Sequence, residues 1–193
     1  MPQILLDKHW SDFYNKGRDC TLAASQDISR FLQYVDPAVP MTALDIGCGT
    51  GQLTRELYHR GYQTIGIDAS SSAIKTARSL TIVSSNHLLY LHFNIERDDL
   101  SRLPCTSFGL ITCKFVYSFI QDRAIFAAAV SRLLADGGLF VIATPLVGCV
   151  PPEKEAIAVN KDGTLGLIQE FFDVVFYEKG GIGYFLCRNE MHV

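Results

Sequence analysis

The sequence lacks any C-x-x-C pair, although it contains six cysteines, at positions 20, 48, 105, 113, 149 and 187. Closely spaced cysteines, alone or with histidines, are typical of zinc sites and of dithiol redox motifs. Because the six are scattered, neither kind of site is expected, and we predict that the protein binds no metal. Unclustered thiols also fit a reducing compartment, so the sequence favours a cytoplasmic protein.

Long hydrophobic runs and an excess of basic charge are absent as well. No stretch approaches the ~20 apolar residues that a membrane span needs, and the N-terminus has neither the charged start nor the apolar run of a secretory signal. We therefore expect no membrane association. Seventeen Lys and Arg against twenty Asp and Glu give a net charge of −3, which disfavours a nucleic-acid partner.

The 193 residues, 48% of them hydrophobic, fit one domain with a sizeable core. From Met41 onward, short apolar runs alternate with helical patterns, which indicates an α/β fold with a doubly wound, mostly parallel sheet. The predicted strands are Ala43–Ile46, Gln63–Ile67, Leu88–Phe93, Gly109–Cys113 and Leu139–Ala143. The predicted helices between them are Gln52–Arg60, Ser71–Leu80 and Arg123–Leu134.

The pattern divides the single predicted domain into three parts: a helical cap or lid over 1–40, a ligand-binding core over 41–145, and a closing part over 146–193. The cap should contain helices at Asp7–Asn15 and Thr21–Tyr34. Trp10, Tyr14, Lys16 and Arg18 could form a lid over a ligand. Alternatively, Trp10, Phe13 and Tyr14 have the spacing of a helix face that packs on the core. The closing part predicts a helix at Leu165–Phe172 and a hairpin of Val174–Tyr177 and Tyr184–Cys187.

A glycine-rich turn follows the first predicted strand, in the segment from Leu44 to Leu53. Gly47, Gly49 and Gly51 allow a sharp turn and a close ligand approach at the start of a helix, where backbone N–H groups are unpaired. The spacing is not the dinucleotide fingerprint G-x-G-x-x-G, because Gln52 stands where that pattern has glycine. Asp45 would repel a pyrophosphate and suits a cationic ligand.

Two further predicted strands also end in polar residues. Asp68 follows the second strand and is placed to accept hydrogen bonds from ribose hydroxyls. Asn94 and Glu96 follow the third strand, where polar side chains could recognise the edge of an adenine. Since open α/β sheets bind ligands at the carboxyl ends of their strands, these positions predict a cationic adenosine ligand, and S-adenosylmethionine fits.

From about residue 40 to about 145, the chain resembles the class I S-adenosylmethionine-dependent methyltransferases, with Leu44–Gly51 similar to the first motif and Gly66–Ile74 to the ribose-binding strand. The resemblance implies a Rossmann-like, seven-stranded sheet in the order 3-2-1-4-5-7-6 with the last strand antiparallel, and a small-molecule methyl acceptor. It implies these cofactor contacts: Asp45, Gly47, Cys48, Gly49 and Gly51 for the methionine end, Asp68 and Ala69 for the ribose, Asn94, Ile95 and Glu96 for the adenine, and Lys114 to Tyr117 for the edge facing the acceptor.

The catalytic residues are less clearly marked. Many family members have two histidines after the fourth strand, whereas this chain has the segment Phe115–Ile120. Alignment and desolvation of the reactants can suffice for methyl transfer; if a base is used, the candidates are Tyr14, Tyr117 and His9. Two alternatives stay open, a non-catalytic S-adenosylmethionine-binding protein and a nucleotide-dependent oxidoreductase. The sequence determines neither the acceptor nor the oligomeric state.

Overall fold

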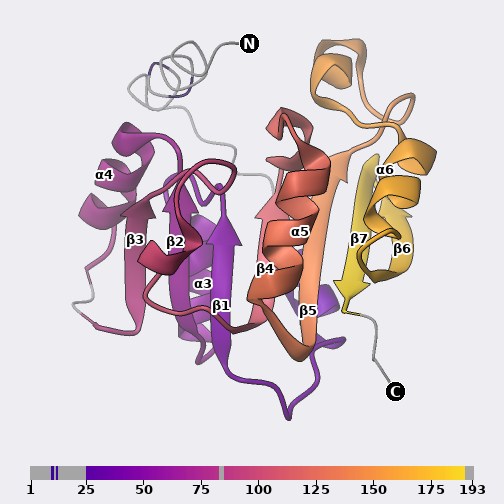
Figure 1. Cartoon of the computed structure of the whole chain (residues 1–193). Coiled ribbons are helices and arrows are strands. Elements are labelled where there is room, and N and C mark those ends of the chain that lie inside the picture. Colours follow the sequence, from indigo (N-terminus) through magenta and orange to yellow (C-terminus); the bar gives the residue numbers. More distant parts are fainter. Residues whose placement is uncertain (1–9, 11, 13–24, 83–84, 190–193) are drawn as a thin grey trace.

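The computed structural model describes residues 10, 12, 25–82 and 85–189. Seven strands form one sheet in the order β3-β2-β1-β4-β5-β7-β6, which confirms the predicted order (Figure 1). Strands β1 to β5 are parallel, and β7 runs antiparallel to both β5 and β6. Their bounds are β1 (Thr42–Ile46), β2 (Gln63–Asp68), β3 (Leu88–His92), β4 (Phe108–Lys114), β5 (Leu134–Pro145), β6 (Asp173–Lys179) and β7 (Ile182–Arg188).

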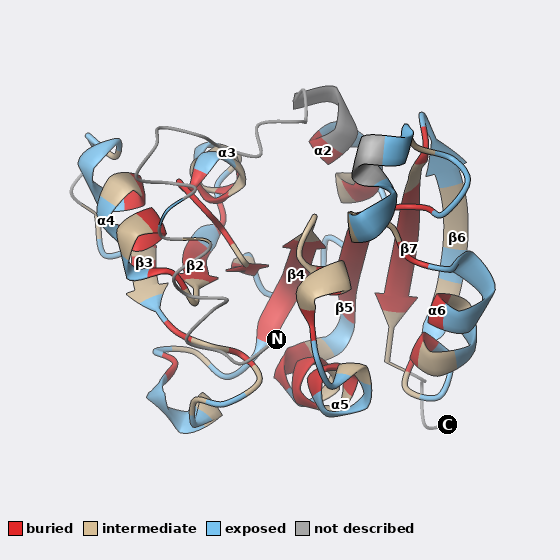
Figure 2. Ribbon diagram, turned by 90° about the horizontal axis from the view of Figure 1, so that it is seen from above, coloured by how far each residue is buried: buried red, intermediate tan, exposed pale blue. Residues whose placement is uncertain are grey.

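Helices cover both faces of the sheet, as expected from the near-continuous apolar runs of the central strands. Figure 2 shows α2 and α3 on one face and α5 on the opposite face. On the α5 side, the aromatic rings of Phe126, Phe140 and Phe185 belong to the core. The helices are α2 (Ser25–Leu32), α3 (Gln52–His59), α4 (Ser71–Ser79), α5 (Arg123–Leu133) and α6 (Lys161–Ile168), with short 3₁₀ helices η1 (Leu100–Arg102), η2 (Tyr117–Phe119) and η3 (Pro152–Ile157).

The order of the chain reverses between β1 and β4, which are hydrogen-bonded neighbours. From β1 the chain continues outward to β2 and β3, whereas from β4 it continues in the other direction to β5. The helices that follow β1 and β4 therefore leave toward opposite faces, and the carboxyl ends of these two strands border a crevice. The fold thus places the predicted ligand-binding turns at one end of the sheet.

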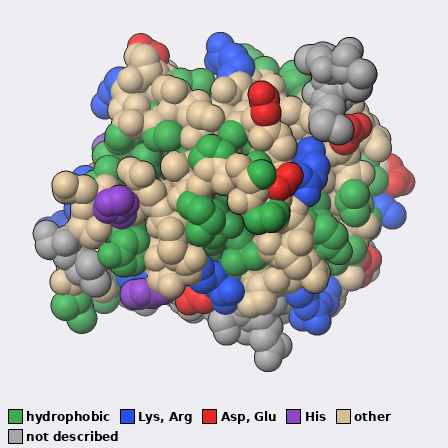
Figure 3. All heavy atoms as spheres, turned by 90° about the horizontal axis from the view of Figure 1, so that it is seen from below, with side chains coloured by type: hydrophobic (Ala, Val, Ile, Leu, Met, Phe, Trp, Pro, Cys, Tyr) green, Lys and Arg blue, Asp and Glu red, His purple; other side chains and the backbone are tan. Residues whose placement is uncertain are grey.

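The opposite end of the molecule has a surface of mixed hydrophobic and charged side chains (Figure 3). Seen from below, it shows hydrophobic side chains at the surface between scattered charges (Figure 3). Met41, directly before β1, is 51% exposed there. None of the predicted ligand-binding turns lies at this end.

Helix α6 corrects one prediction. The sequence placed the closing helix at Leu165–Phe172, but the helix begins four residues earlier, at Lys161, and ends at Ile168. The side chain of Asn160 accepts a hydrogen bond from the Gly163 N–H and caps the first turn. The predicted N-terminal helix Asp7–Asn15 lies outside the described residues except for Trp10 and Asp12.

Candidate functional site

A cavity lies at the carboxyl ends of β1, β2, β3 and β4. Its empty space, open solvent included, is about 760 Å³. All four strand ends contribute side chains, and the segment before α2 contributes Trp10. The lining residues are Trp10, Ile46, Gly47, Ile67, Asp68, Ala69, Phe93, Asn94, Ile95, Glu96, Lys114, Phe115, Val116, Phe119 and Ile120.

The glycine-rich turn connects β1 to α3 and can be built only from glycine at two positions. Gly47 and Gly51 have φ angles of 68° and 81°, which L-residues with a side chain rarely adopt. A Cβ atom on Gly47 would stand 2.2 Å from a methyl group of Val116, and one on Gly51 would stand 2.5 Å from the ring of Tyr90. The turn therefore packs against Val116, in the segment after β4, on one side and against Tyr90 of β3 on the other.

Asp68, at the end of β2, lies in the cavity wall beside this turn. Its Oδ2 accepts a hydrogen bond from the Gly49 N–H at 2.9 Å, and its Oδ1 accepts one from the Ser70 N–H at 2.8 Å. The Ser70 hydroxyl in turn caps α4. Two backbone N–H groups thus fix the orientation of the carboxylate.

Asp45 lies deeper than expected. It is 2% exposed and does not line the cavity. Its carboxylate accepts hydrogen bonds from the hydroxyls of Thr54, at 2.7 Å, and Thr112, at 2.9 Å. Burial raises the pKa of Asp45 to about 6, against the opposing effects of the two hydroxyls and of Lys114. In this structure, Asp45 ties α3 to β1 and β4 beneath the turn.

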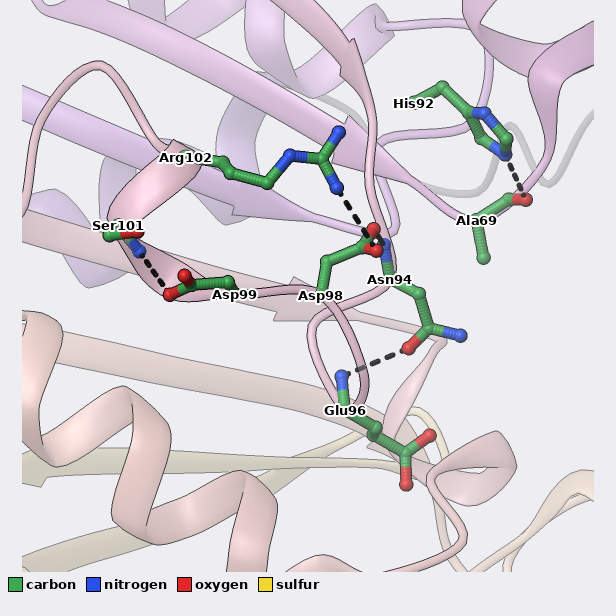
Figure 4. Close-up of polar contacts among 8 residues, drawn as sticks. All are labelled: Ala69, His92, Asn94, Glu96, Asp98, Asp99, Ser101 and Arg102. Carbon is green, nitrogen blue, oxygen red and sulfur yellow. Dashed lines mark hydrogen bonds and ion pairs between the residues drawn. The ribbon is translucent and has the colours of Figure 1, made fainter.

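Asn94 and its neighbours form a tight turn after β3 (Figure 4). The Asn94 Oδ1 accepts a hydrogen bond from the Glu96 N–H at 2.9 Å, and the Asn94 N–H donates to Asp98 at 2.8 Å. Asp98 forms an ion pair with Arg102 at 3.2 Å. Asn94, Ile95 and Glu96, which the family resemblance assigns to the adenine, all line the cavity.

Glu96 makes a contact that the sequence analysis missed. Its Oε1 accepts hydrogen bonds from the N–H groups of Gln121 and Asp122, both at 2.9 Å. Asp122 caps α5 through Ile125. One carboxylate oxygen therefore connects the turn after β3 to the loop between β4 and α5.

The segment after β4 supplies the other wall. Phe115 has a φ angle of 59°, and its N–H donates to the Ala143 carbonyl at 2.8 Å. The Lys114 ammonium lies 5.1 Å from the centre of the Phe115 ring. Phe119 packs edge-to-face on Trp10, with ring centres 4.9 Å apart. Phe93, Phe119 and Ile120 also line the cavity; the only sequence signal for the last two was the apolar run directly after the fourth strand.

The structure does not bring Tyr117 to the cavity, which corrects its prediction as a cofactor contact or base. The single turn of η2 directs its ring into the core, where it is fully buried against Phe126, with the Arg123 guanidinium 4.9 Å above it. Burial raises the pKa of Tyr117 to about 12. The other two base candidates, His9 and Tyr14, lie outside the described residues.

Cys48 occupies the glycine turn without facing the cavity. Its thiol lies 3.7 Å from the Gly49 carbonyl oxygen. Burial, followed by the nearby carboxylates of Asp68 and Asp45, raises the pKa of the thiol well above its usual value. Cys48 therefore fills space between the turn and α4, where it packs with Ile74 and Ala77.

Among the described residues, no helix is both long and apolar enough to span a membrane. These residues also contain no group of three or more His, Cys, Asp or Glu side chains arranged to hold a metal ion.

Comparison with known sequences gives a family match. Residues 44–142 match the family model described as a methyltransferase domain. The ubiquinone biosynthesis O-methyltransferase of Psychrobacter cryohalolentis is 35% identical over 104 residues, covering 52% of this chain and 39% of the relative. The enzyme of the same name from Nitrosomonas europaea is 28% identical over 117 residues, covering 58% and 49%. The chain thus spans about half of these relatives or less.

Solved structures share the fold at low sequence identity. A TehB-like SAM-dependent methyltransferase from Corynebacterium glutamicum superposes with a TM-score of 0.65 and 17% identity, covering 95% of each chain. The glycopeptide N-methyltransferase MtfA, solved in complex with S-adenosyl-L-methionine, superposes with a TM-score of 0.68 and 13% identity, covering 89% of this chain and 96% of MtfA. These likenesses extend beyond the family match to nearly the whole chain.

Proposed function

The chain belongs to the methyltransferase-domain family, and from this premise we propose that it transfers a methyl group from S-adenosylmethionine to a small-molecule acceptor. The observation that carries the proposal is Asp68, held by the Gly49 and Ser70 N–H groups in the wall of a cavity beside the glycine turn. An acid at the end of the second strand, directed into such a crevice, suits the two hydroxyls of a ribose.

The cavity residues fit the rest of this cofactor. Phe93 and Ile95 offer apolar surface for an adenine, and Ala69 and Asn94 lie next to it in the wall. Gly47 brings the backbone of the turn to the cavity surface without a side chain. Beneath the turn, Asp45 contributes negative charge toward a cationic centre, through its field and without direct contact. The predicted contacts of Asp45 and Cys48 are thus best assigned to shaping the turn.

S-adenosylmethionine, when bound, supplies an electrophilic methyl group on a positively charged sulfur. The described residues of the cavity supply three titratable side chains, Asp68, Glu96 and Lys114. Asp68 and Glu96 already accept backbone hydrogen bonds. These side chains and the apolar wall therefore act by orienting the reactants and excluding water, and His9 and Tyr14 remain the proposed bases should the acceptor need one.

The acceptor is proposed to be a small molecule with an oxygen nucleophile. The two sequence relatives compared above are O-methyltransferases by name, which favours oxygen as the acceptor atom. Membership of the methyltransferase-domain family disfavours the alternative of a nucleotide-dependent oxidoreductase. Measuring turnover distinguishes an enzyme from a non-catalytic binding protein, because only an enzyme releases S-adenosylhomocysteine when an acceptor is added.

Isothermal titration with S-adenosylmethionine and S-adenosylhomocysteine tests the proposal. Asp68→Ala should weaken both affinities by about tenfold to a hundredfold, since hydrogen bonds to a charged group contribute about 1.5–3 kcal/mol. Asp136→Ala is the matched control, because Asp136 is exposed in the first part of β5, outside the cavity lining. Absence of binding by folded wild-type protein, or equal losses in both variants, would refute the proposed site.

A further inference from the structure

Strand β6 is the end strand of the sheet, and in the described part of the chain no strand pairs with its outer side (Figure 1). Helix α6 packs against α5 and β7, which lie further in. An open strand edge is a row of N–H and C=O groups without strand partners, and folded proteins either block such an edge or use it to pair with another chain. Which of the two applies depends on the residues of β6.

The usual blocking devices are absent from β6, which the structure describes in full. Proteins protect an edge with a proline, a bulge or a charged side chain in the middle of the strand. β6 contains no proline and pairs with β7 without a shift of register. Its charged residues, Asp173, Glu178 and Lys179, stand at the two ends, and its middle consists of β-branched and aromatic residues. Val175, one of these, is 60% exposed. The strand therefore suits pairing.

The hairpin determines the direction of each backbone group in β6. Gly180 and Gly181 join β6 to β7, and their φ angles of 58° and 77° are both positive, as a two-residue type I′ turn requires. Lys179 and Ile182, the pair that flanks the turn, therefore exchange hydrogen bonds, and every second pair after it does the same. The Leu146 N–H donates to the Gly181 carbonyl at 3.0 Å, which agrees with this alternation because it turns the other residues of β7 toward β5.

The N–H and C=O groups of Val174, Phe176 and Glu178 consequently point to the open edge. A second copy of β6 meets these groups when it runs antiparallel to the first about a twofold axis at Phe176. Val174 then pairs with Glu178 of the second copy, and Phe176 pairs with its own counterpart, which gives about six backbone hydrogen bonds. Among axis positions along the strand, only this one pairs β6 over its whole length.

The side chains of β6 match in the same register. Asp173 lies opposite Lys179 of the second copy, and the twofold axis repeats this pair of opposite charges at the other end. An ammonium group has three N–H donors, so it can form this ion pair beside other contacts. Between the ends, the exposed Val175 lies opposite Tyr177 of the second copy, and a β-branched residue opposite an aromatic one is a favourable cross-strand pair.

We propose that β6 pairs with β6 of a second copy of this chain, antiparallel about Phe176, and so joins the two sheets into one. The same strand serves as the interface on both sides, so this contact closes at two copies. The antiparallel arrangement directs the carboxyl ends of β1 to β4 oppositely in the two copies. The two cavities therefore open at opposite ends of the joined sheet, and neither copy contributes to the cavity of the other. The pairing is independent of the methyl transfer proposed above.

Sedimentation equilibrium of the full chain, at concentrations up to about 100 μM, tests the pairing. We expect a dimer with twice the 21.4 kDa mass of one chain. Glu178→Pro removes one outward N–H group from each copy, and an edge strand tolerates proline where the N–H faces outward. The dissociation constant should therefore rise about fivefold to a hundredfold. Glu178→Ala is the matched control, because it removes the same side chain but keeps the N–H group, and it should dimerise like wild type.

Val175→Lys provides a second test, through a side chain. It places a charge in the middle of the strand, as natural edge protection does, at a position that is exposed in the single chain. The dissociation constant should rise about twofold to thirtyfold, because both copies lose a cross-strand pair. Val147→Lys is the matched control, because Val147 is 50% exposed but lies outside β6.

Far-ultraviolet circular dichroism checks that each variant is folded; if Glu178→Pro does not fold, Val175→Lys decides alone. A mass of 21.4 kDa for wild-type protein throughout the concentration range refutes the pairing. A dimer that the folded test variants do not weaken, or that their controls weaken equally, refutes it as well, because the interface then lies elsewhere.

Discussion

Replacing Gly47 with alanine should destabilise the protein strongly, for two separable reasons. Its φ angle of 68° costs an L-residue about 1–2 kcal/mol. The added Cβ would also stand 2.2 Å from a Val116 methyl group, and overpacking of this kind costs about 1–3 kcal/mol. Together these effects predict a loss of about 2–5 kcal/mol in the free energy of unfolding, if they are additive.

A double-mutant cycle separates the two effects. Val116→Ala removes the methyl groups that meet the new Cβ, so Gly47→Ala should cost about 1–3 kcal/mol less in the Val116→Ala background. The strain of the backbone should remain in both backgrounds. The measurement is urea unfolding of the four proteins, followed by far-ultraviolet circular dichroism.

Gly166→Ala is the control for the glycine-to-alanine change itself. Gly166 lies within α6, has no atom within 4 Å of a built Cβ and has no left-handed φ. Alanine there should raise the free energy of unfolding by up to about 1 kcal/mol, because it favours the helix. If Gly47→Ala is as harmless as Gly166→Ala, or if its cost is independent of Val116, the described packing of the turn is wrong.

Three further predictions concern stability. Burial raises the pKa of Asp45 from 3.8 to about 6 on folding; the folded state therefore holds the proton more tightly, and the resulting stability is lost as pH rises from about 4 through about 6. The free energy of unfolding of Asp45→Asn, measured by urea unfolding relative to wild type, should thus rise by up to about 3 kcal/mol over that pH range. A difference between the two proteins that does not change with pH would contradict this pKa. Glu96→Ala should cost about 1–2 kcal/mol by leaving the Gln121 and Asp122 N–H groups without their acceptor, whereas Glu96→Gln, which keeps an acceptor oxygen, should restore most of it; equal losses would refute the contact. Asn160→Ala should cost about 1 kcal/mol through loss of the α6 cap, measured by thermal unfolding, and no loss would place the start of the helix elsewhere.

The central sheet could be predicted because its signals are local. Each of the first five strands contains an apolar run, whereas their order was predicted from the family resemblance that the glycine turn and Asp68 carry. Helix α6 was misplaced because Gly163 and Gly166 weaken its helical pattern, whereas the apolar residues after Leu165 are more prominent. The cap at Asn160 was the signal that could have corrected the start of the helix.

The residues of the candidate site, like the strands of the sheet, could be predicted where the sequence signal is local. The local turn after β2 marked Asp68 as a ribose contact, and the structure places Asp68 in the cavity wall. The hydrogen bonds of Glu96 could not be predicted, because their donors lie 25 and 26 residues away and are backbone groups, which leave no side-chain pattern. The burial of Tyr117 was missed because one short 3₁₀ turn decides whether a side chain faces the cavity or the core.

The buried thiol of Cys48 has a chemical consequence for a protein that handles a methylating agent. A thiolate is a strong nucleophile, and one at the surface of a methyl-donor pocket would itself be alkylated, whereas the protonated thiol is far less reactive. The closed packing of Cys48 against α4, together with its raised pKa, keeps this sulfur protonated and out of the cavity. The turn can therefore carry a cysteine for its small size without exposing the protein to self-methylation at that residue.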